Sequence, residues 1–385
     1  MLNNRWAILA LLIVVRLVMG YQFQAVASMT PFMVADLGLD YAQIGTLVGF
    51  YMLPGIIISL PGALFGRRYT DLTMVLFGVA VMALGGVVSG LADSFAMLAF
   101  GRLIGGVGAV LQSLFMLKMV AEWFDQKSVT TAMAILLSGW PVGVALALTT
   151  MAPMAAQWGW QVVMYISALS CLMALISVWL GYRPPPGGQA PSRSGIGFHM
   201  PRRELGLICY IGVVWAFYNL SYFSFLSFGP AMLIERGMDA ATAGAAISLS
   251  SWAALPALPL GGYLADRTGR PGLVLTICCI IAAMAAAALP LVDQPFILSA
   301  MIGLFAAAPA GIIMGRAILT MSPANRTLGN AILYTFFYGG MGLAPGLVGW
   351  SADISGTAAT PIFLSAAILA LTAPLFLGQY LLAKD

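Results

Sequence analysis

The sequence has very little charge. Charged residues make up 8% of its 385 positions and hydrophobic residues 61%, whereas a typical soluble domain is about 25% charged. This composition excludes a soluble globular protein. The formal net charge is +4, which is too small and too scattered to indicate a nucleic-acid partner.

Histidine and cysteine are also scarce. The single histidine, His199, lies in a polar stretch, so no histidine-based metal site can be assembled. The four cysteines lie in apolar runs without a Cys-x-x-Cys pair, and we expect buried thiols and no disulfide: Cys171, Cys209, Cys278 and Cys279. Nucleophile–base constellations and phosphate-binding loops are absent as well. We therefore predict neither an enzyme nor a bound cofactor or metal.

Long apolar runs dominate the chain instead. About 20 apolar residues cross a bilayer as a helix, and the runs are continuous rather than alternating, which favours helical spans. The predicted fold is all-α, with twelve transmembrane helices at about residues 6–34, 42–65, 72–92, 95–121, 128–153, 160–182, 205–234, 241–264, 272–292, 295–321, 327–351 and 361–383. We interpret the first run as a span and not as a removable signal peptide, because no small-residue cleavage site follows it.

A polar segment divides the twelve runs into two sets of six. It reads "YRPPPGGQAPSRSGIGFHMPRRE" over residues 182–204 and is rich in Pro, Gly and Ser, as is typical of a linker. We expect an N-terminal six-helix bundle over residues 1–182, a linker over 183–203 and a C-terminal six-helix bundle over 204–385.

The two halves repeat each other. "GLDYAQIG" at 38–45 returns as "GMDAATAG" at 237–244, and "GALFGRRYT" at 62–70 returns as "GGYLADRTG" at 261–269. Matches at equivalent places indicate an internal duplication, and duplicated six-span units form parallel repeats. Lys and Arg in the short loops gather on one side, which predicts that both termini and the linker are cytoplasmic.

Three short motifs resemble one transporter family. "RLIGGVG" begins at Arg102 and has the spacing Arg-x-x-x-Gly-x-Gly. "GYLADRTGRP" matches a loop motif, Gly-x-x-x-Asp-Arg-x-Gly-Arg-Arg, at every named position but the last. Its degraded first copy "GALFGRRYTD" has Gly66 in place of the aspartate. With the duplication, these motifs resemble the major facilitator superfamily over essentially the whole chain. The resemblance implies a conformational role for Gly62, Arg67, Gly262, Asp266, Arg267 and Arg270.

Two further phrases bear on the kind of transporter. "GWPVG" at 139–143 is similar to part of the helix 5 signature of exporters in this family. Together with "YTFFYGGMGLAPG" at 334–346 it also resembles bacterial permeases of the cyanate and nitrate/nitrite type, although the asparagine-containing glycine signature of nitrate carriers is missing.

Charge inside the predicted spans is all of one sign. Arg16, Arg102, Lys118 and Arg316 lie within spans, whereas every Asp and Glu lies in a loop or at a span end. The family resemblance implies that helices 1, 4, 7 and 10 line a central cavity, and these helices carry all four cations. Arg16 follows Trp6 by ten residues, or about 15 Å of helix, near the middle of a roughly 30 Å core where charge is costly.

We therefore predict that Arg16 binds an anionic substrate, and that Arg102, Lys118 and Arg316 gate the pathway or recruit the anion. A structural role is the alternative for Arg102. Snorkelling to the membrane surface is the alternative for Lys118 and Arg316.

Polar and aromatic residues gather at the same depth. Such groups need partners away from water, and we predict that they donate hydrogen bonds to the substrate, helix packing being the alternative. They are Tyr21, Gln22, Gln24, Tyr218, Asn219, Tyr222, Tyr334 and Tyr338.

These features predict a secondary transporter that moves a small organic or inorganic anion by alternating access. We expect a monomer in the lipid bilayer of a bacterial inner membrane. Without a carboxylate inside the spans, coupling is by anion exchange, uniport, or symport in which the substrate carries the proton. An exporter of drugs or hydrophobic metabolites is the alternative. A membrane sensor is a further one, although neither the linker nor the short tails provide an output domain.

Overall fold

The computed structural model describes residues 4–65, 69–125, 128–185, 200–322 and 325–382. The chain divides into two compact units, which are described separately below. Unit 1 comprises Met1–Leu39 and Phe50–Ser194, and unit 2 comprises Asp40–Gly49 and Gly195–Asp385. The predicted linker lies mostly outside the described residues, as does Arg67.

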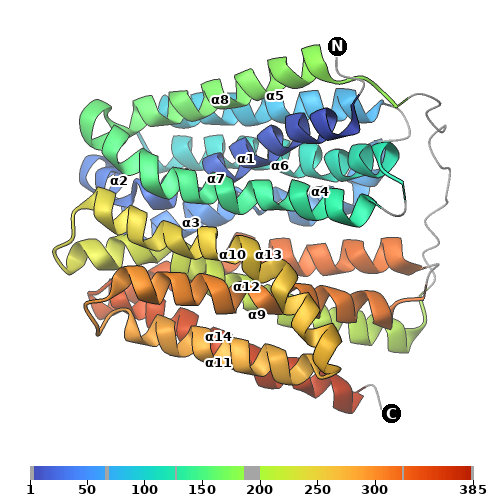
Figure 1. The fold of residues 1–385 in the computed structure, drawn as a ribbon. Coiled ribbons are helices and arrows are strands. Elements are labelled where there is room, and N and C mark those ends of the chain that lie inside the picture. Colours follow the sequence, from blue (N-terminus) through green and yellow to red (C-terminus); the bar gives the residue numbers. More distant parts are fainter. Residues whose placement is uncertain (1–3, 66–68, 126–127, 186–199, 323–324, 383–385) are drawn as a thin grey trace. The chain divides into compact units, whose positions relative to one another are not determined.

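Unit 1 consists of helices that run side by side (Figure 1). The fifth and sixth helices in the chain pack closely, as do the first and seventh. The helices are α1 (Arg5–Ser28), α2 (Thr30–Leu37), α4 (Pro54–Phe65), α5 (Asp71–Gly90), α6 (Phe95–Trp123), α7 (Val129–Trp158) and α8 (Trp160–Gly181).

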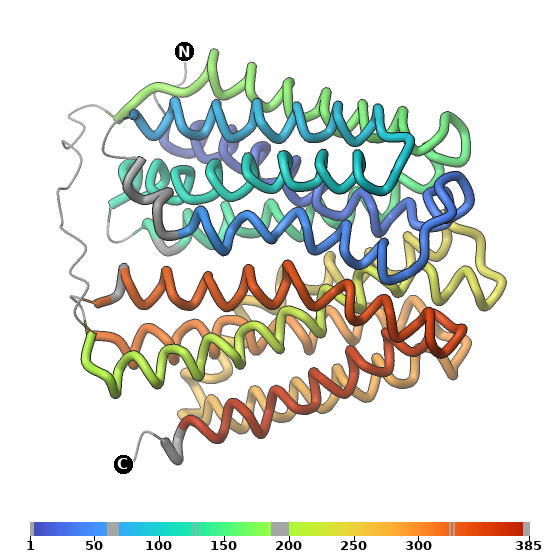
Figure 2. Tube along the Cα trace, turned by 180° about the vertical axis from the view of Figure 1, so that it is seen from behind, coloured from blue at the N-terminus to red at the C-terminus, as the bar shows by residue number. Residues whose placement is uncertain are grey.

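Unit 2 is built in the same manner (Figure 2). Its helices are α3 (Tyr41–Phe50), α9 (Arg202–Glu235), α10 (Ala240–Thr268), α11 (Pro271–Ala288), α12 (Pro295–Thr320), α13 (Arg326–Ser355) and α14 (Ala359–Leu382). All of α3 except its last residue belongs to this unit, although its sequence comes from the first repeat.

Within the described residues, twelve helical stretches are long and apolar enough to cross a membrane. Their positions agree with the predicted spans, with two differences. The first predicted span ends as a helix at Ser28, and α2 begins at Thr30 with Pro31 in its first turn. The second is broken at residues 51–53, before Pro54. Proline cannot donate the backbone hydrogen bond that would continue the helix across this point.

Glycines allow α5 and α6 to pack backbone against backbone. A Cβ atom built on Gly108 would lie 2.3 Å from the carbonyl oxygen of Gly78, and one on Gly85 would lie 2.4 Å from the amide nitrogen of Gly105. Neither position has room for a side chain. The absence of a side chain at these glycines therefore permits the close approach of α5 and α6.

Short polar side chains cap several helices. The Asn4 side chain accepts from the amide of Trp6 at the start of α1, and Thr70 does so from Thr73 at the start of α5. Asp239 accepts from the amide of Thr242 at the start of α10, and hydrogen bonds from the side chain and then the backbone amide of Thr242 hold the pKa of its carboxyl below the usual value. All four cysteines are free thiols, of which Cys209 alone is half-buried and the others buried.

Candidate functional site

Arg16 lies on α1 where three helices of unit 1 meet. Its Nη1 donates to the hydroxyl oxygen of Ser113 on α6 at 2.9 Å. Its guanidinium carbon lies 5.4 Å from the ring centroid of Trp140 on α7, a distance at which an aromatic face attracts a cation. The side chain is only partly buried. Unit 1 thus presents a positive charge at mid-span, held in place by a hydroxyl group and an indole ring.

Close packing of α1 and α7 fixes this geometry. A Cβ atom on Gly139 would lie 3.0 Å from the Cβ of Arg16, and one on Gly20 would lie 2.4 Å from the carbonyl oxygen of Trp140. The two glycines therefore bring the α7 backbone against α1. Trp140 is held in turn by Phe23, whose ring centroid lies 5.0 Å from its own.

A buried amide orients Ser113. The side chain of Gln112 is fully buried, and its Nε2 donates to the Ser113 hydroxyl oxygen at 3.1 Å. The Ser113 hydroxyl also lies 3.1 Å from the sulfur of Met19. The sequence prediction missed Ser113, Gln112 and Trp140. The polar pair "QS" inside the apolar run of α6 and the tryptophan of "GWPVG" were the available signals.

The three polar residues that follow Arg16 on α1 point in different directions. The Tyr21 hydroxyl lies 3.1 Å from that of Thr150 on α7. Gln22 is buried; its Nε2 donates to the Met82 carbonyl at 3.0 Å, and its Oε1 accepts from the Tyr51 hydroxyl at 3.0 Å. Gln24 is fully buried. Gln22 is thus turned into the interior of unit 1, because its amide finds partners there.

Arg102 makes backbone contacts deep inside unit 1. It is 2% exposed, and its two terminal nitrogens donate to the carbonyl oxygens of Gln22 and Phe23 at 2.8 and 2.9 Å. Its guanidinium carbon lies 4.4 Å from the centroid of the Tyr51 ring. This geometry braces α1 against α6 and fits the structural alternative for Arg102.

Lys118 and Arg316 lie toward the ends of α6 and α12. The ammonium group of Lys118 is 2.9 Å from a carboxylate oxygen of Asp71, the first residue of α5. Lys118 is exposed and Asp71 largely buried. Part of the Lys118 charge is therefore balanced inside unit 1. The side chain of Arg316 in unit 2 is half-buried.

Three of the predicted residues of unit 2 lie in an aromatic cluster on α9 and α13, which we call the α9/α13 cluster. The Trp215 ring stacks on Tyr218 with centroids 5.4 Å apart, and Phe337 lies 6.4 Å from Trp215. The rings of Tyr334 and Tyr338 are 6.2 Å apart, and each also contacts Phe337. Sequence analysis included three of these five residues and missed Trp215 and Phe337.

Polar atoms in and next to this cluster bond within unit 2. The Tyr218 hydroxyl donates to the carbonyl oxygen of Ala306 on α12 at 2.6 Å. The Asn219 amide donates to the carbonyl of Trp215, one turn earlier on α9, at 2.8 Å. The Tyr222 hydroxyl lies beside the hydroxyls of Ser250 and Ser251 on α10.

The second copy of the loop motif is well placed for a short turn. Gly262, Asp266 and Arg267 lie in the last turns of α10, and Gly269 ends the helix with a φ of +63°, a conformation that glycine adopts without strain. Arg267 is exposed and donates to the Tyr263 hydroxyl at 3.2 Å. Arg270 precedes the first residue of α11. In the first copy, Gly62 lies in α4.

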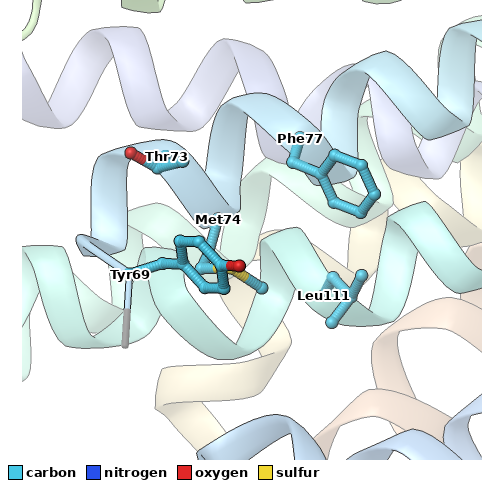
Figure 3. Close-up of a pocket in the computed structure, with 5 residues that line it drawn as sticks. All are labelled: Tyr69, Thr73, Met74, Phe77 and Leu111. Carbon is cyan, nitrogen blue, oxygen red and sulfur yellow. The ribbon is translucent and has the colours of Figure 1, made fainter. Parts of the chain in front are cut away.

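An apolar cavity of about 390 Å³ lies elsewhere in unit 1 (Figure 3). It is lined by Tyr69, Thr73, Met74 and Phe77 at the start of α5 and by Leu111 on α6. Among the described residues, no charged side chain lines the cavity, so its apolar lining differs from the charged surroundings of Arg16.

Comparison with known proteins places the chain in a family. A family model described as Major Facilitator Superfamily matches residues 12–235 and again 214–385. The chain is 25% identical over 263 residues to the 3-(3-hydroxy-phenyl)propionate transporter of Escherichia coli K12, covering 66% of this chain and 64% of that protein. It is 22% identical over 271 residues to the hexuronate transporter of Bacillus subtilis 168, covering 66% and 63%. The matches thus span less than two thirds of the length of these curated relatives.

The same fold occurs in a solved structure. A bacterial homologue of the human lysosomal transporter Spinster, in an inward-facing and unoccupied conformation, is similar over 97% of this chain and 98% of its own, with a TM-score of 0.78 and 19% identity. The repeated family match also confirms the two six-helix repeats. The protein is a multi-pass membrane protein, with twelve candidate spans in the part of the chain that the structure describes, and it belongs to the major facilitator superfamily.

Proposed function

We propose that this protein is a secondary transporter for a small organic anion, and that Arg16 binds the carboxylate of the substrate. The observation that carries the proposal is the position of Arg16: a permanent positive charge at mid-span, partly exposed on unit 1 and oriented by Ser113 and Trp140. Guanidinium groups bind carboxylates through two parallel hydrogen bonds, which gives both affinity and orientation.

The charge distribution of the sequence supports an anion rather than a cation. Every Asp and Glu lies in a loop or at the end of a span, so an anionic substrate is the natural negative charge at the depth of Arg16. Its binding lowers the cost of taking the arginine out of water. A substrate that binds one conformation more tightly then shifts the protein toward it, which drives alternating access.

The relatives support an organic acid. Hydroxyphenylpropionate and hexuronate, the compounds in the names of the two curated relatives, are both carboxylic acids of modest size. An inorganic anion, as in the predicted resemblance to cyanate and nitrate/nitrite permeases, remains an untested prediction.

Location and orientation follow from the same reasoning. We propose a monomer in a bacterial inner membrane. We propose that both termini are on the cytoplasmic side, because Lys and Arg in short loops mark that side. Coupling is by exchange, by uniport, or by a proton that the substrate carries.

Transport by the purified protein in liposomes tests this function. The panel contains 3-phenylpropionate, a hexuronate, nitrate, cyanate and the lipophilic cation tetraphenylphosphonium, each with and without a pH gradient. Removing one charge-assisted hydrogen bond costs about 1.5–3 kcal/mol, so R16Q should reduce uptake of the best anion at least about tenfold. Uptake by R16K, which keeps the positive charge but lacks the planar guanidinium group, should fall between that of R16Q and that of the wild type.

R5Q is the matched control. Arg5 lies on the same helix but is exposed at its end, 3.7 Å from Asp125, and its removal should leave uptake unchanged. Wild-type uptake of the best anion by R16Q would overturn the role of Arg16. Transport of tetraphenylphosphonium and of none of the anions would favour the exporter alternative.

A further inference from the structure

Neutral groups hold Arg16 in place in unit 1. Its Nη1 donates to the Ser113 hydroxyl at 2.9 Å and lies 3.6 Å from the sulfur of Met19. The ring centroid of Trp140 lies 5.4 Å from its guanidinium carbon, and the amide of Gln112 donates to Ser113. A hydroxyl, a thioether, an indole ring and an amide carry no net charge. They orient the guanidinium group without cancelling its charge.

Arg102, a second cation inside the spans of unit 1, is used by the protein itself. Its two terminal nitrogens donate to backbone carbonyl oxygens of α1 at 2.8 and 2.9 Å, and its guanidinium group lies against the ring of Tyr51. The side chain is 2% exposed. A substrate cannot reach Arg102 unless these contacts between α1 and α6 are broken. Arg102 therefore offers no charge for a substrate.

The other two cations inside the spans lie at another depth. Arg16 is about 16 Å along α1 from the first residue of that helix, at 1.5 Å per residue. Lys118 lies about 8 Å before the end of α6, and Arg316 about 6 Å before the end of α12. Successive spans alternate in direction, so the start of the first span and the ends of the fourth and tenth belong to the same side of the membrane. Lys118 and Arg316 are thus nearer to that side than Arg16, and Lys118 is paired with Asp71 at 2.9 Å.

The spans therefore carry one net positive charge at mid-depth, that of Arg16. The remaining Lys and Arg residues lie in loops or at span ends, as does every Asp and Glu. A bound monoanion balances the charge of Arg16, which lowers the cost of enclosing the arginine away from water. A compact dianion brings a second negative charge to the same depth. An uncompensated charge inside a membrane lowers an equilibrium constant about a hundredfold.

We propose that the substrate is a monoanion, and that the single charge of Arg16 sets this limit. The inference rests on the proposed function, in which Arg16 binds the carboxylate of an organic anion. It adds the charge of the whole substrate: one carboxylate is accepted, the rest of the molecule is neutral, and compact dicarboxylates are rejected. Arg16 then determines specificity as well as affinity.

Uptake of matched compounds that differ by one negative charge tests this limit. The purified protein in liposomes is given 3-phenylpropionate and phenylsuccinate, glucuronate and glucarate, or nitrate and sulfate, at equal concentrations and neutral pH. The second compound of each pair carries the additional charge. In the pair that the protein transports, the monoanion should enter about a hundredfold faster than the dianion. A difference of less than about tenfold would overturn the proposal.

Monomethyl esters separate charge from size. The monomethyl esters of phenylsuccinate, glucarate and sulfate are slightly larger than the parent dianions but carry a single negative charge. Uptake of the ester should return to within about tenfold of that of the matching monoanion. An ester that enters no faster than its dianion would show that size excludes the dianion, and would overturn the proposal.

A second cation beside Arg16 should admit the dianion. W140K places an ammonium group where the Trp140 ring lies, 5.4 Å from the guanidinium carbon. Two positive charges then attract two negative ones, and the ratio of dianion to monoanion uptake should rise at least about tenfold. W158K is the matched control, because it adds the same charge at the exposed end of the same helix, and the ratio should stay unchanged. A folded W140K protein with the wild-type ratio would overturn the proposal.

R16Q distinguishes the failure of this inference from that of the proposed function. If the wild type carries both members of a pair equally and R16Q lowers the uptake of both, Arg16 binds the anion and only the single-charge limit is overturned. If R16Q takes up the monoanion like the wild type, the role of Arg16 is overturned and the limit falls with it.

Discussion

The two units tie the first helix of each repeat to the fourth in different ways. In unit 1, Arg102 on α6 donates to two carbonyl oxygens of α1. In unit 2 the direction is reversed and the charge is absent, because the Tyr218 hydroxyl on α9 donates to a carbonyl of α12. Duplication has kept the arrangement of helices, whereas the bonding chemistry between them has diverged.

The same contrast holds for the surfaces at mid-span. Unit 1 carries a guanidinium group between a hydroxyl and an indole ring, at Arg16, Ser113 and Trp140. Unit 2 carries the α9/α13 cluster, and the sequence of α9 has no basic residue beyond its first turn. On the proposed function, binding of the anionic group at mid-span falls to Arg16 of unit 1, whereas α9 and α13 of unit 2 offer aromatic surface.

The largest difference between the two units should appear in thermal stability, when the hydrogen bonds that join these helices are removed. R102M deletes bonds from a buried charge, which are worth about 1.5–3 kcal/mol each, whereas Y218F deletes a neutral bond worth about 0.5–1.5 kcal/mol. Thermal unfolding of the purified protein should therefore show a larger drop in midpoint for R102M than for Y218F. R267M, which removes an exposed arginine of unit 2, should unfold like the wild type. An equal drop in the unfolding midpoint for R102M and Y218F would show that the charge of Arg102 adds no stability to the contact between its helices.

A smaller effect is expected from the residue that orients Arg16. S113A removes the hydroxyl that accepts from the Arg16 guanidinium. The arginine side chain is then less well oriented before it binds the substrate. We expect KM for the best anion to rise about tenfold with little change in the amount of folded protein, as one charge-assisted bond would give. S299A, at a buried serine of α12 in unit 2, is the control. Similar KM values for S113A and S299A would remove Ser113 from the site.

The smallest effect compares the two tryptophans. W140F keeps an aromatic ring beside Arg16 but weakens the attraction for the cation, which is worth about 0.5–1 kcal/mol at partly exposed sites. Uptake of the best anion at low concentration should fall about two- to fivefold. W215F, in the α9/α13 cluster, should leave recognition of the anionic group unchanged. The ratio of the uptake of a carboxylate substrate to the uptake of its neutral amide measures this recognition. A larger loss in W215F than in W140F would reverse the assignment of charge recognition to unit 1.

Sequence reasoning could predict the spans, the duplication and the depth of Arg16, because each depends on local composition or on residue spacing. It could not predict the partners of Arg16. Ser113 and Trp140 are about 100 residues away along the chain, and only the packing of α6 and α7 against α1 brings them together. The depth of a residue in the membrane also does not show which way its side chain points. Gln22 and Arg102 turn into the interior of unit 1, because polar groups away from water bond to partners within reach.

The break in the second span shows another limit. Pro54 is visible in the sequence at the interruption, but a single sequence does not show that the half-helix before Pro54 packs with the other unit. That outcome depends on Asp353 and on glycines of α13, which lie about 300 residues later. Contacts at such sequence separation leave no periodic pattern in either segment.

The absence of a side chain at Gly139 has a consequence for the placement of Arg16. Because a methyl group there would meet the β-carbon of Arg16 at 3.0 Å, a single change to alanine would reposition the guanidinium group without altering its charge. On the proposed role of Arg16, a change at Gly139 would alter how the substrate is held through a residue that touches no substrate, with the charge of the arginine unchanged.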